Sequence, residues 1–274
     1  MLPTRGLDEL VQQARRNEEI QKRLDQVEEF LLATHDLAGL LASLPPTVMQ
    51  VYRLEAVTLV LLAEHQALQD ALASMQLMGM PETCITRPRK ELRLLLADLE
   101  GPYLTNKVTS QLLACFFPRH RRLVSLAVLP LWVGGQMLGT LNLGADSPQR
   151  YMPALDTHFL ERLGRKAAFG LNAALLLERA RRMEQRQAMV EMAGAACHEL
   201  AQPLATLMLG MDKLSRSLAP DDPRRQELES LMDQAERMGD TVKKISQVND
   251  YVTRPYAQGL RIVDLQAASS KEAG

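Results

Sequence analysis

Residues 123–143 read LVSLAVLPLWVGGQMLGTLNL and contain the clearest strand signal of the chain. Two apolar runs, residues 123–132 and 137–143, flank the pair Gly134-Gly135. Glycine adopts positive φ angles at little cost, so such a pair between two apolar runs is typical of a tight β-hairpin. Together with residues 56–62, a short apolar run that reads as a buried strand, this stretch predicts a sheet in the middle of the chain.

Helical patterns lie on both sides of this sheet. Residues 7–40 predict one amphipathic helix, which is expected to end at Leu44-Pro45-Pro46. Shorter helices are expected at residues 90–99 and 107–115. The apolar residues of the first helix follow the spacing of a coiled coil or a helix bundle; they are Ile20, Leu24, Val27 and Leu31.

A long helix is expected from Pro153 to about Arg182, and its pattern runs on without a Gly- or Pro-rich linker. The residues that recur every seven positions are Leu176, Met183, Val190 and Cys197. A continuous helix of this kind could carry a twist or a change of register from one module to the next, or it could be an inert spacer. The sequence favours neither interpretation.

The last third of the chain has the most regular apolar pattern. A first stripe runs from Cys197 to Leu218, and a second runs from Leu228 to Ile245. Between them, Asp222 can cap free backbone amides and Pro223 fits a first helical turn. The pattern predicts an antiparallel helical hairpin. One hairpin leaves its stripe half covered, whereas two hairpins bury it in a four-helix bundle, so we expect a homodimer.

Residues 198–204, HELAQPL, contain the candidate site. At about 100° per residue, His198 points away from the apolar stripe, and Gln202 shares its face one turn later. Glu199 is placed to polarise the imidazole or accept its proton, and Pro203 is expected to kink the helix beside it. An exposed neutral imidazole can attack a phosphoryl group near pH 7. The plainer interpretation is a surface histidine at a Pro-kinked point of an interaction helix.

The HELAQPL string, placed early on the first helix of a hairpin, resembles the H-box of the dimerisation and phosphoacceptor (HisKA-type) domain of sensor histidine kinases. The resemblance implies that His198 is the phosphoacceptor and Glu199 its acid/base neighbour. Gln202 occupies the position where related proteins often carry Thr or Asn, which are linked to phosphatase activity; a Gln there puts that activity in doubt.

A complete kinase of this family also needs an ATP-binding domain, and no Gly-rich phosphate-binding loop occurs in this sequence. Residues 259–265, GLRIVDL, resemble only the first strand that opens such a domain, and the rest of the tail, to Gly274, is small and polar. We therefore expect ATP to act only through a partner kinase domain, without autonomous autophosphorylation.

The middle region has a second resemblance. The strings GGQMLGTLNLG, DSPQRYMP and FLERLG within residues 123–182 are similar to the second half of GAF domains, and in particular to a bacterial GAF-like family of unknown function with an N-terminal coiled-coil helix. This implies a small-molecule pocket, or a dimerising module that has lost its ligand. The sequence identifies no pocket residue and no cofactor, and Cys84 and Cys115 are expected to be core or loop thiols.

These observations predict an α+β protein: a GAF-like antiparallel sheet with helices, flanked by an N-terminal coiled-coil helix and a C-terminal dimeric hairpin. The expected parts are an amphipathic helix at 1–45, a GAF-like sensor at 46–180, a linker and HisKA-type hairpin at 181–252, and a tail at 253–274.

Composition narrows the possible environments and partners. A formal net charge of -1 over 274 residues argues against nucleic acid and anionic membranes as partners. The 3 cysteines have no metal-ligand spacing, and with no secretion signal or membrane-length apolar run they favour the cytoplasm. Residue 202 is Gln, which excludes the second His of a zinc-protease helix.

The sequence thus predicts a cytoplasmic, homodimeric signal transducer of the two-component type. In it, a GAF-like input controls His198, which a kinase ATPase domain phosphorylates in trans or which relays phosphoryl groups to a response-regulator receiver. One alternative is a non-catalytic scaffold or decoy that binds kinases or receivers and in which His198 is a relic. Another is a divided kinase whose ATPase domain is a separate chain.

Overall fold

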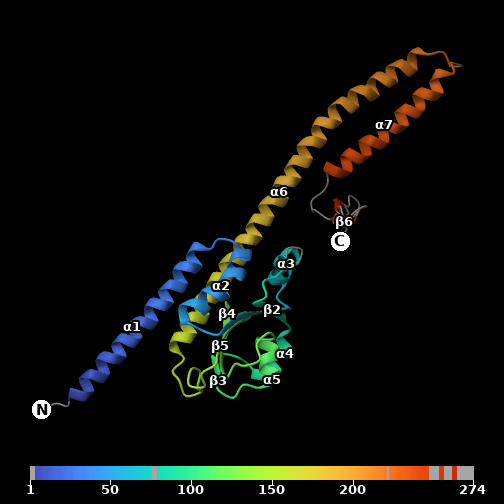
Figure 1. Ribbon diagram of the computed structural model, residues 1–274. Coiled ribbons are helices and arrows are strands. Elements are labelled where there is room, and N and C mark those ends of the chain that lie inside the picture. The colour runs from blue at the N-terminus through green and yellow to red at the C-terminus, as the bar shows by residue number, and fades with distance from the viewer. Residues whose placement is uncertain (1–3, 76–78, 221, 247–252, 256–260, 264–274) are drawn as a thin grey trace. The chain divides into compact units, whose positions relative to one another are not determined.

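The computed structural model describes residues 4–75, 79–220, 222–246, 253–255 and 261–263. The chain forms two compact units, Met1–Ala180 and Arg181–Gly274. Figure 1 shows a sheet with helices in the first unit and a helical hairpin in the second. The predicted α+β class is confirmed.

The first unit is built on a five-stranded sheet with the order β2-β1-β5-β4-β3. The predicted hairpin is confirmed: it consists of β4 (Ser125–Val133) and β5 (Gln136–Ala145), joined by Gly134 and Gly135 at φ 56° and 77°. β1 (Ala56–Leu62) pairs antiparallel with β5, as does β3 (Tyr103–Thr105) with β4. β2 (Cys84–Arg87) is the exception and lies parallel to β1, because the helix α3 (Gln66–Met75) carries the chain back between them.

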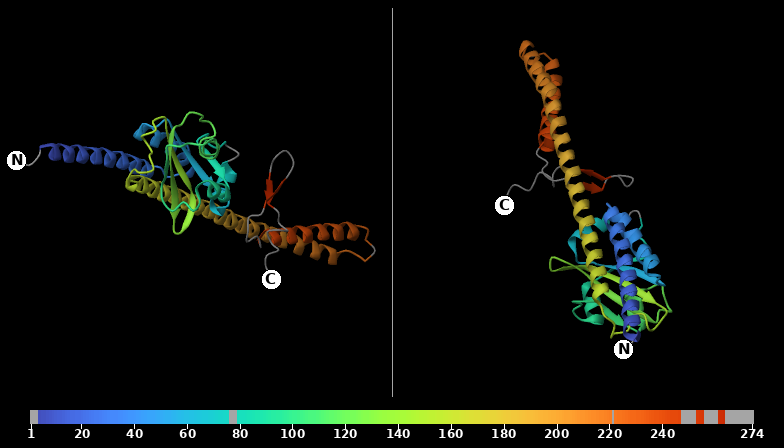
Figure 2. Two further views of the ribbon diagram at one scale, coloured as in Figure 1. Left: turned by 90° about the horizontal axis from the view of Figure 1, so that it is seen from below. Right: turned by 90° about the vertical axis from the view of Figure 1, so that its left-hand side faces the viewer.

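Helices cover both faces of this sheet, so its central strands are buried on both sides. On one face, α2 (Leu37–Tyr52) and the start of α6 (His158–Ser217) pack on alternate residues of β1 and β4, such as Leu59 and Leu129. On the other face, α4 (Arg89–Leu96) and α5 (Ser110–Phe116) pack on the intervening residues, such as Val60 and Val128. This arrangement can be followed in Figure 1 and Figure 2.

The prediction of one N-terminal helix that ends at the proline pair is wrong. α1 (Thr4–Ala33) ends earlier, and α2 contains both Pro45 and Pro46. The break has a local cause, because the Asp36 carboxylate caps α2 by accepting from the Gly39 backbone N–H at 2.6 Å. Burial of Leu44, Pro45 and Val48 offsets the backbone hydrogen bonds that the prolines remove.

The predicted apolar stripe of α1 packs within the first unit. Leu24 and Val27 are fully buried in the core. Polar contacts with α6 flank the stripe: Arg162 donates to the Gln21 amide oxygen at 2.8 Å, and Lys166 pairs with Glu28. In this stretch α1 therefore packs against other helices of the same chain, as a helix in a bundle does.

The second unit contains the remainder of α6, then α7 (Arg224–Ser246), β6 (Thr253–Pro255) and β7 (Arg261–Val263). α6 has 60 residues and begins at His158, five residues after the predicted start at Pro153; the predicted continuity beyond Arg182 is confirmed. Of the predicted strand at 259–265, the described part pairs with β6 as an antiparallel ladder, and the other residues lie outside the described ranges.

Candidate functional site

The two helices of the hairpin meet along an inner seam of small and apolar side chains. Cys197 and Leu204 of α6 are 4% and 9% exposed, and Leu228 and Ala235 of α7 are both 7% exposed. These residues stand seven apart on each helix, the spacing predicted for the stripes. Burial of this seam holds the two helices side by side.

His198 lies next to this seam and is exposed, as predicted. It lines a groove of about 430 Å³ between α6 and α7. The floor of the groove includes small residues, which leave room beside the imidazole; they are Gly194, Ala201, Ala205 and Gly239. Lys243 and Ser246, near the end of α7, line the same groove. Sequence reasoning missed both, because which residues of α7 line the groove depends on how the two helices are paired.

The three predicted neighbours of His198 differ in their position relative to its imidazole; they are Gln202, Glu199 and Pro203. The Gln202 amide nitrogen is 3.3 Å from the imidazole Nε2, so the predicted sharing of a face by these residues is confirmed. Glu199 is exposed and is not among the residues that line the groove. α6 remains helical on both sides of Pro203, which cannot donate the backbone hydrogen bond that the Glu199 carbonyl would normally accept.

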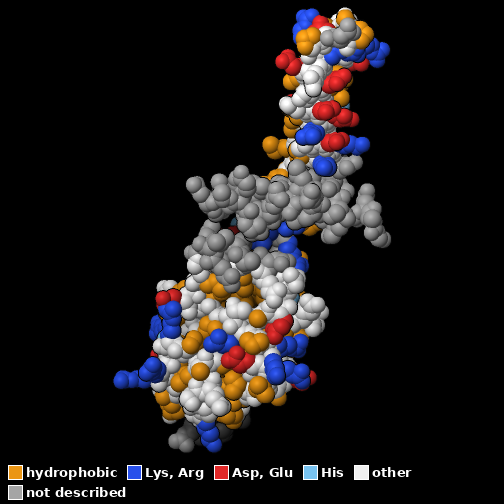
Figure 3. All heavy atoms as spheres, turned by 90° about the vertical axis from the view of Figure 1, so that its right-hand side faces the viewer, with side chains coloured by type: hydrophobic (Ala, Val, Ile, Leu, Met, Phe, Trp, Pro, Cys, Tyr) orange, Lys and Arg blue, Asp and Glu red, His pale blue; other side chains and the backbone are white. Residues whose placement is uncertain are grey.

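A second apolar stripe remains exposed along the hairpin, and we call it the outer stripe. Its members are 52–62% exposed; they are Leu200, Leu207, Leu214, Leu231 and Met238. On both helices the outer stripe lies on the same rotational side of the seam, so in an antiparallel pair it forms one face. His198 lies on the opposite side of α6. Figure 3 shows apolar side chains at the surface along the hairpin, next to charged ones.

Residues 4–168 match the family described as "Protein of unknown function, DUF484". The chain belongs to this family. The match ends in α6, before His198. Among solved structures, the chain is similar to free methionine-R-sulfoxide reductase from Neisseria meningitidis, solved in complex with its substrate. The identity is 14% and the TM-score 0.36, over 57% of this chain and 89% of that one. No curated protein matches the chain.

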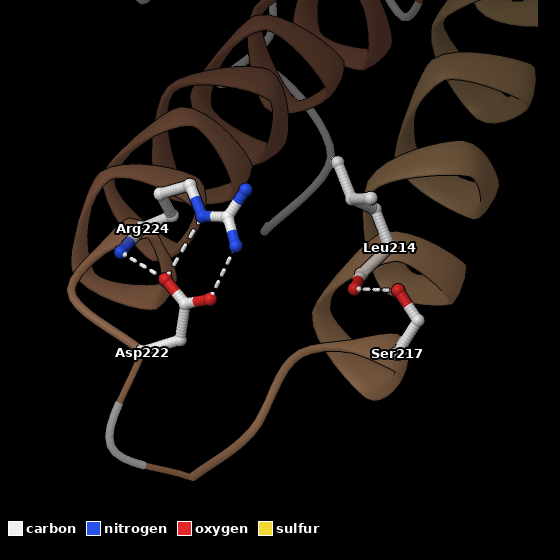
Figure 4. A network of polar contacts seen from close by, with 4 residues as sticks. All are labelled: Leu214, Ser217, Asp222 and Arg224. Atoms are coloured by element: carbon white, nitrogen blue, oxygen red, sulfur yellow. Dashed lines mark hydrogen bonds and ion pairs between the residues drawn. The ribbon is translucent and has the colours of Figure 1, made fainter.

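The loop between the hairpin helices of this DUF484 protein is fixed by Asp222, as predicted. Its carboxylate accepts from the backbone N–H of Arg224 at 2.9 Å and from the Arg224 guanidinium at 3.0 and 2.6 Å (Figure 4). On the other side of the loop, the Ser217 hydroxyl donates to the Leu214 carbonyl at 2.7 Å, in the last turn of α6. The side-chain and backbone hydrogen bonds from Arg224 lower the pKa of Asp222 to about 2.

This cap should make the hairpin sensitive to acid. A carboxyl pKa below its ordinary value of 3.8 stabilises the folded form above that value, and the contribution is lost as the pH falls toward 2. We expect Asp222→Asn to weaken the acid-induced loss of helix between about pH 4 and pH 2 and to lower the melting temperature at pH 7. Far-UV circular dichroism measures both the loss of helix with pH and the melting temperature. Asp233→Asn, in the exposed middle of α7, is the control, and equal curves for the two variants would contradict the role of the cap.

The first unit of the DUF484 chain contains a wider hollow of about 590 Å³ between β4 and α6. Trp132, Arg165 and the exposed Phe169 are among the residues that line it. On the other face of the sheet, the buried Thr58 hydroxyl donates to the Phe116 carbonyl at 2.6 Å and accepts from Asn142 at 3.1 Å. The sequence pointed to none of these residues. The hollow depends on how β4 and α6 pack, and polar side chains inside an apolar strand, such as Thr58 and Asn142, leave no periodic signal.

The cysteines have the environment expected of structural thiols. Cys84, Cys115 and Cys197 are free and buried. Burial raises the pKa of Cys84 to about 12 and that of Cys115 to about 11, so neither is a ready nucleophile at neutral pH. Among the described residues, no group of His, Cys, Asp and Glu is placed to hold a metal ion. Nor does any described helix combine the length and the apolar character needed to cross a bilayer.

Proposed function

We propose that this DUF484 protein is a cytoplasmic signal transducer in which His198 accepts and passes on a phosphoryl group. The observation that carries the proposal is the placement of His198: its imidazole is exposed, beside Gln202, at a groove between paired helices. A phosphoryl donor can reach such a ring, whereas the apolar side of the same helix is held in the inner seam.

The chemistry needs a phosphoryl donor, and we propose a separate kinase ATPase domain for this role. A kinase ATPase domain would bring ATP, the His198 Nε2 would form a bond to the γ-phosphorus, and ADP would leave. The Nε2–P bond would then break as an Asp oxygen of a response-regulator receiver attacks the phosphorus. Gln202 lies within hydrogen-bonding distance of Nε2, so it must turn aside before that nitrogen can attack. Glu199, one residue on, is available to take up a proton.

We propose further that the hairpin works as a homodimer. The outer stripe leaves five large apolar side chains more than half exposed, which a second hairpin would cover in a four-helix bundle. His198 is on the opposite side of α6 from Leu207, so it would stay accessible in that dimer. This is what phosphoryl exchange with a partner domain requires.

In this proposal the first unit is a GAF-like input module. It would respond to a small molecule, or to the state of another protein, and bias the hairpin. α6 is one helix from His158 to Ser217, and so it belongs to both units. That continuity supports transmission through α6, although an inert spacer would have the same backbone.

Phosphorylation tests the proposal directly. The full chain is incubated with ATPase-domain kinases from its own cell and radiolabelled ATP, and acid-labile label is measured. We expect label on the wild type and none on His198→Ala, while His158→Ala, another exposed histidine, keeps the label. If no kinase labels the wild type, the proposed phosphoacceptor function is wrong.

A second candidate is a non-catalytic scaffold that docks kinases or receivers. The apolar groove and the outer stripe favour it, since both would bind a partner without any chemistry at His198. In that case His198→Ala would leave signalling intact and Leu207→Asp would abolish it. The phosphoacceptor function predicts loss of signalling in both variants.

A further inference from the structure

We infer that Lys243 of α7 binds the phosphoryl group on His198 and speeds its attachment. The inference rests on the proposed function and assigns a residue from the second helix to the same site. Lys243 and His198 come from different helices and are 45 positions apart in sequence, yet they line one groove.

The charge in the groove supports this role. Apart from His198, Lys243 is the one ionisable side chain other than a thiol among the described residues that line it, and no carboxylate lines it. Elsewhere the wall is small or apolar, with Ala201, Ala205 and Val242 as examples. A phosphoryl group on Nε2 would carry close to two negative charges into this space. The ammonium group of Lys243, which lines the same groove, is the natural counter-charge for it.

The local structure holds the lysine backbone in place. The Ser246 hydroxyl donates to the Lys243 carbonyl at 2.8 Å, within the last turn of α7. Gly239, one turn earlier on the same face, leaves the space through which the lysine side chain can reach toward α6. The Leu204 side chain would be 3.6 Å from a Cβ at that position, so a larger residue there would fill the groove.

Lys244 provides a matched comparison. It is exposed like Lys243, but it lies about 100° further around α7 and does not line the groove. Removal of either lysine changes the net charge of the protein equally. A difference between the two variants therefore reports on position and not on overall charge.

A small phosphoryl donor tests the inference without a kinase. Phosphoramidate transfers its phosphoryl group to imidazole: the P–N bond to ammonia breaks, the Nε2–P bond forms, and ammonia leaves. The labelling rate of His198 in the full chain is followed by phosphorus NMR and by mass spectrometry of the His198 peptide. We expect Lys243→Ala to slow labelling about tenfold, which is the scale of one charge-assisted contact. Lys243→Arg should restore most of the rate, and Lys244→Ala should match the wild type.

The outcomes separate the two proposals. If Lys243→Ala and Lys244→Ala label at equal rates, the role of Lys243 is overturned and the phosphoacceptor function stands. If His198 of the wild type takes no label while an exposed histidine such as His158 does, both are overturned. Circular dichroism confirms that each variant keeps its helix content, and added salt should narrow the gap between wild type and Lys243→Ala by screening the charge.

Discussion

Leu207→Asp is expected to convert the proposed homodimer into monomers. Leu207 is the most exposed member of the outer stripe on α6, at 62%. Burial of one leucine side chain contributes about 1.5–3 kcal/mol to the free energy of association. A symmetric dimer buries two, because each protomer contributes its own Leu207. An unpaired carboxylate at the same position adds a desolvation cost. The proposed dimer should weaken by at least about a hundredfold, since each factor of ten corresponds to about 1.4 kcal/mol.

Leu209→Asp is the matched control for this experiment. Leu209 is 57% exposed, so the two leucines are almost equally accessible in the single chain. It lies about 200° around α6 from Leu207 and therefore off the outer stripe. In sedimentation equilibrium, Leu209→Asp should remain dimeric while Leu207→Asp sediments as a monomer. The same state for both variants would contradict the assignment of the dimer face.

Gly139→Ala is expected to be the most destabilising single change in the first unit. Gly139 lies in β5 opposite Leu61, and an added Cβ would clash with the Val60 carbonyl oxygen and stand 3.1 Å from the Leu61 Cα. These are backbone atoms at the centre of the sheet, so the strands must shift to relieve the clash. Overpacking of this kind costs about 3 kcal/mol, which lowers the melting temperature of the unit by about 10 °C.

Gly101→Ala separates this clash from a general effect of removing glycine. A Cβ at Gly101 would meet no atom within 4 Å. We expect its melting temperature to stay within about 2 °C of the wild type, as for most surface changes. Scanning calorimetry of both variants measures the difference. If the Gly139→Ala protein has the same melting temperature as the wild type, β1 and β5 are not paired in this register.

The parts of the fold with a strong local signal could be predicted from the sequence. Gly134-Gly135 determined the hairpin, and Asp222-Pro223 determined the start of α7. The helix through Pro45 and Pro46 could not be predicted in this way, because a proline pair normally ends a helix and only burial in the core explains one there. The edge strands β2 and β3 have 4 and 3 residues, too few for a periodic signal.

The candidate site also contains residues that could be predicted from the sequence and a residue that could not. His198 and Gln202 are one turn apart on one helix, so helical geometry alone placed them together. Lys243 reaches the same groove from the other helix, and its contribution depends on the register of α6 against α7. The seven-residue repeat indicates that the helices pair, but it leaves open which residues of α7 stand opposite His198.

In the proposed function, His198 carries a phosphoryl group in the working protein. The most direct measurement is mass spectrometry of the chain isolated from its own cells, kept cold and at alkaline pH so that a phosphorus–nitrogen bond survives. We expect a phosphoryl group on the peptide that contains His198, and its disappearance when the partner kinase is deleted. A chain that stays unmodified at His198 under every growth condition, while His198→Ala cells signal normally, would contradict it.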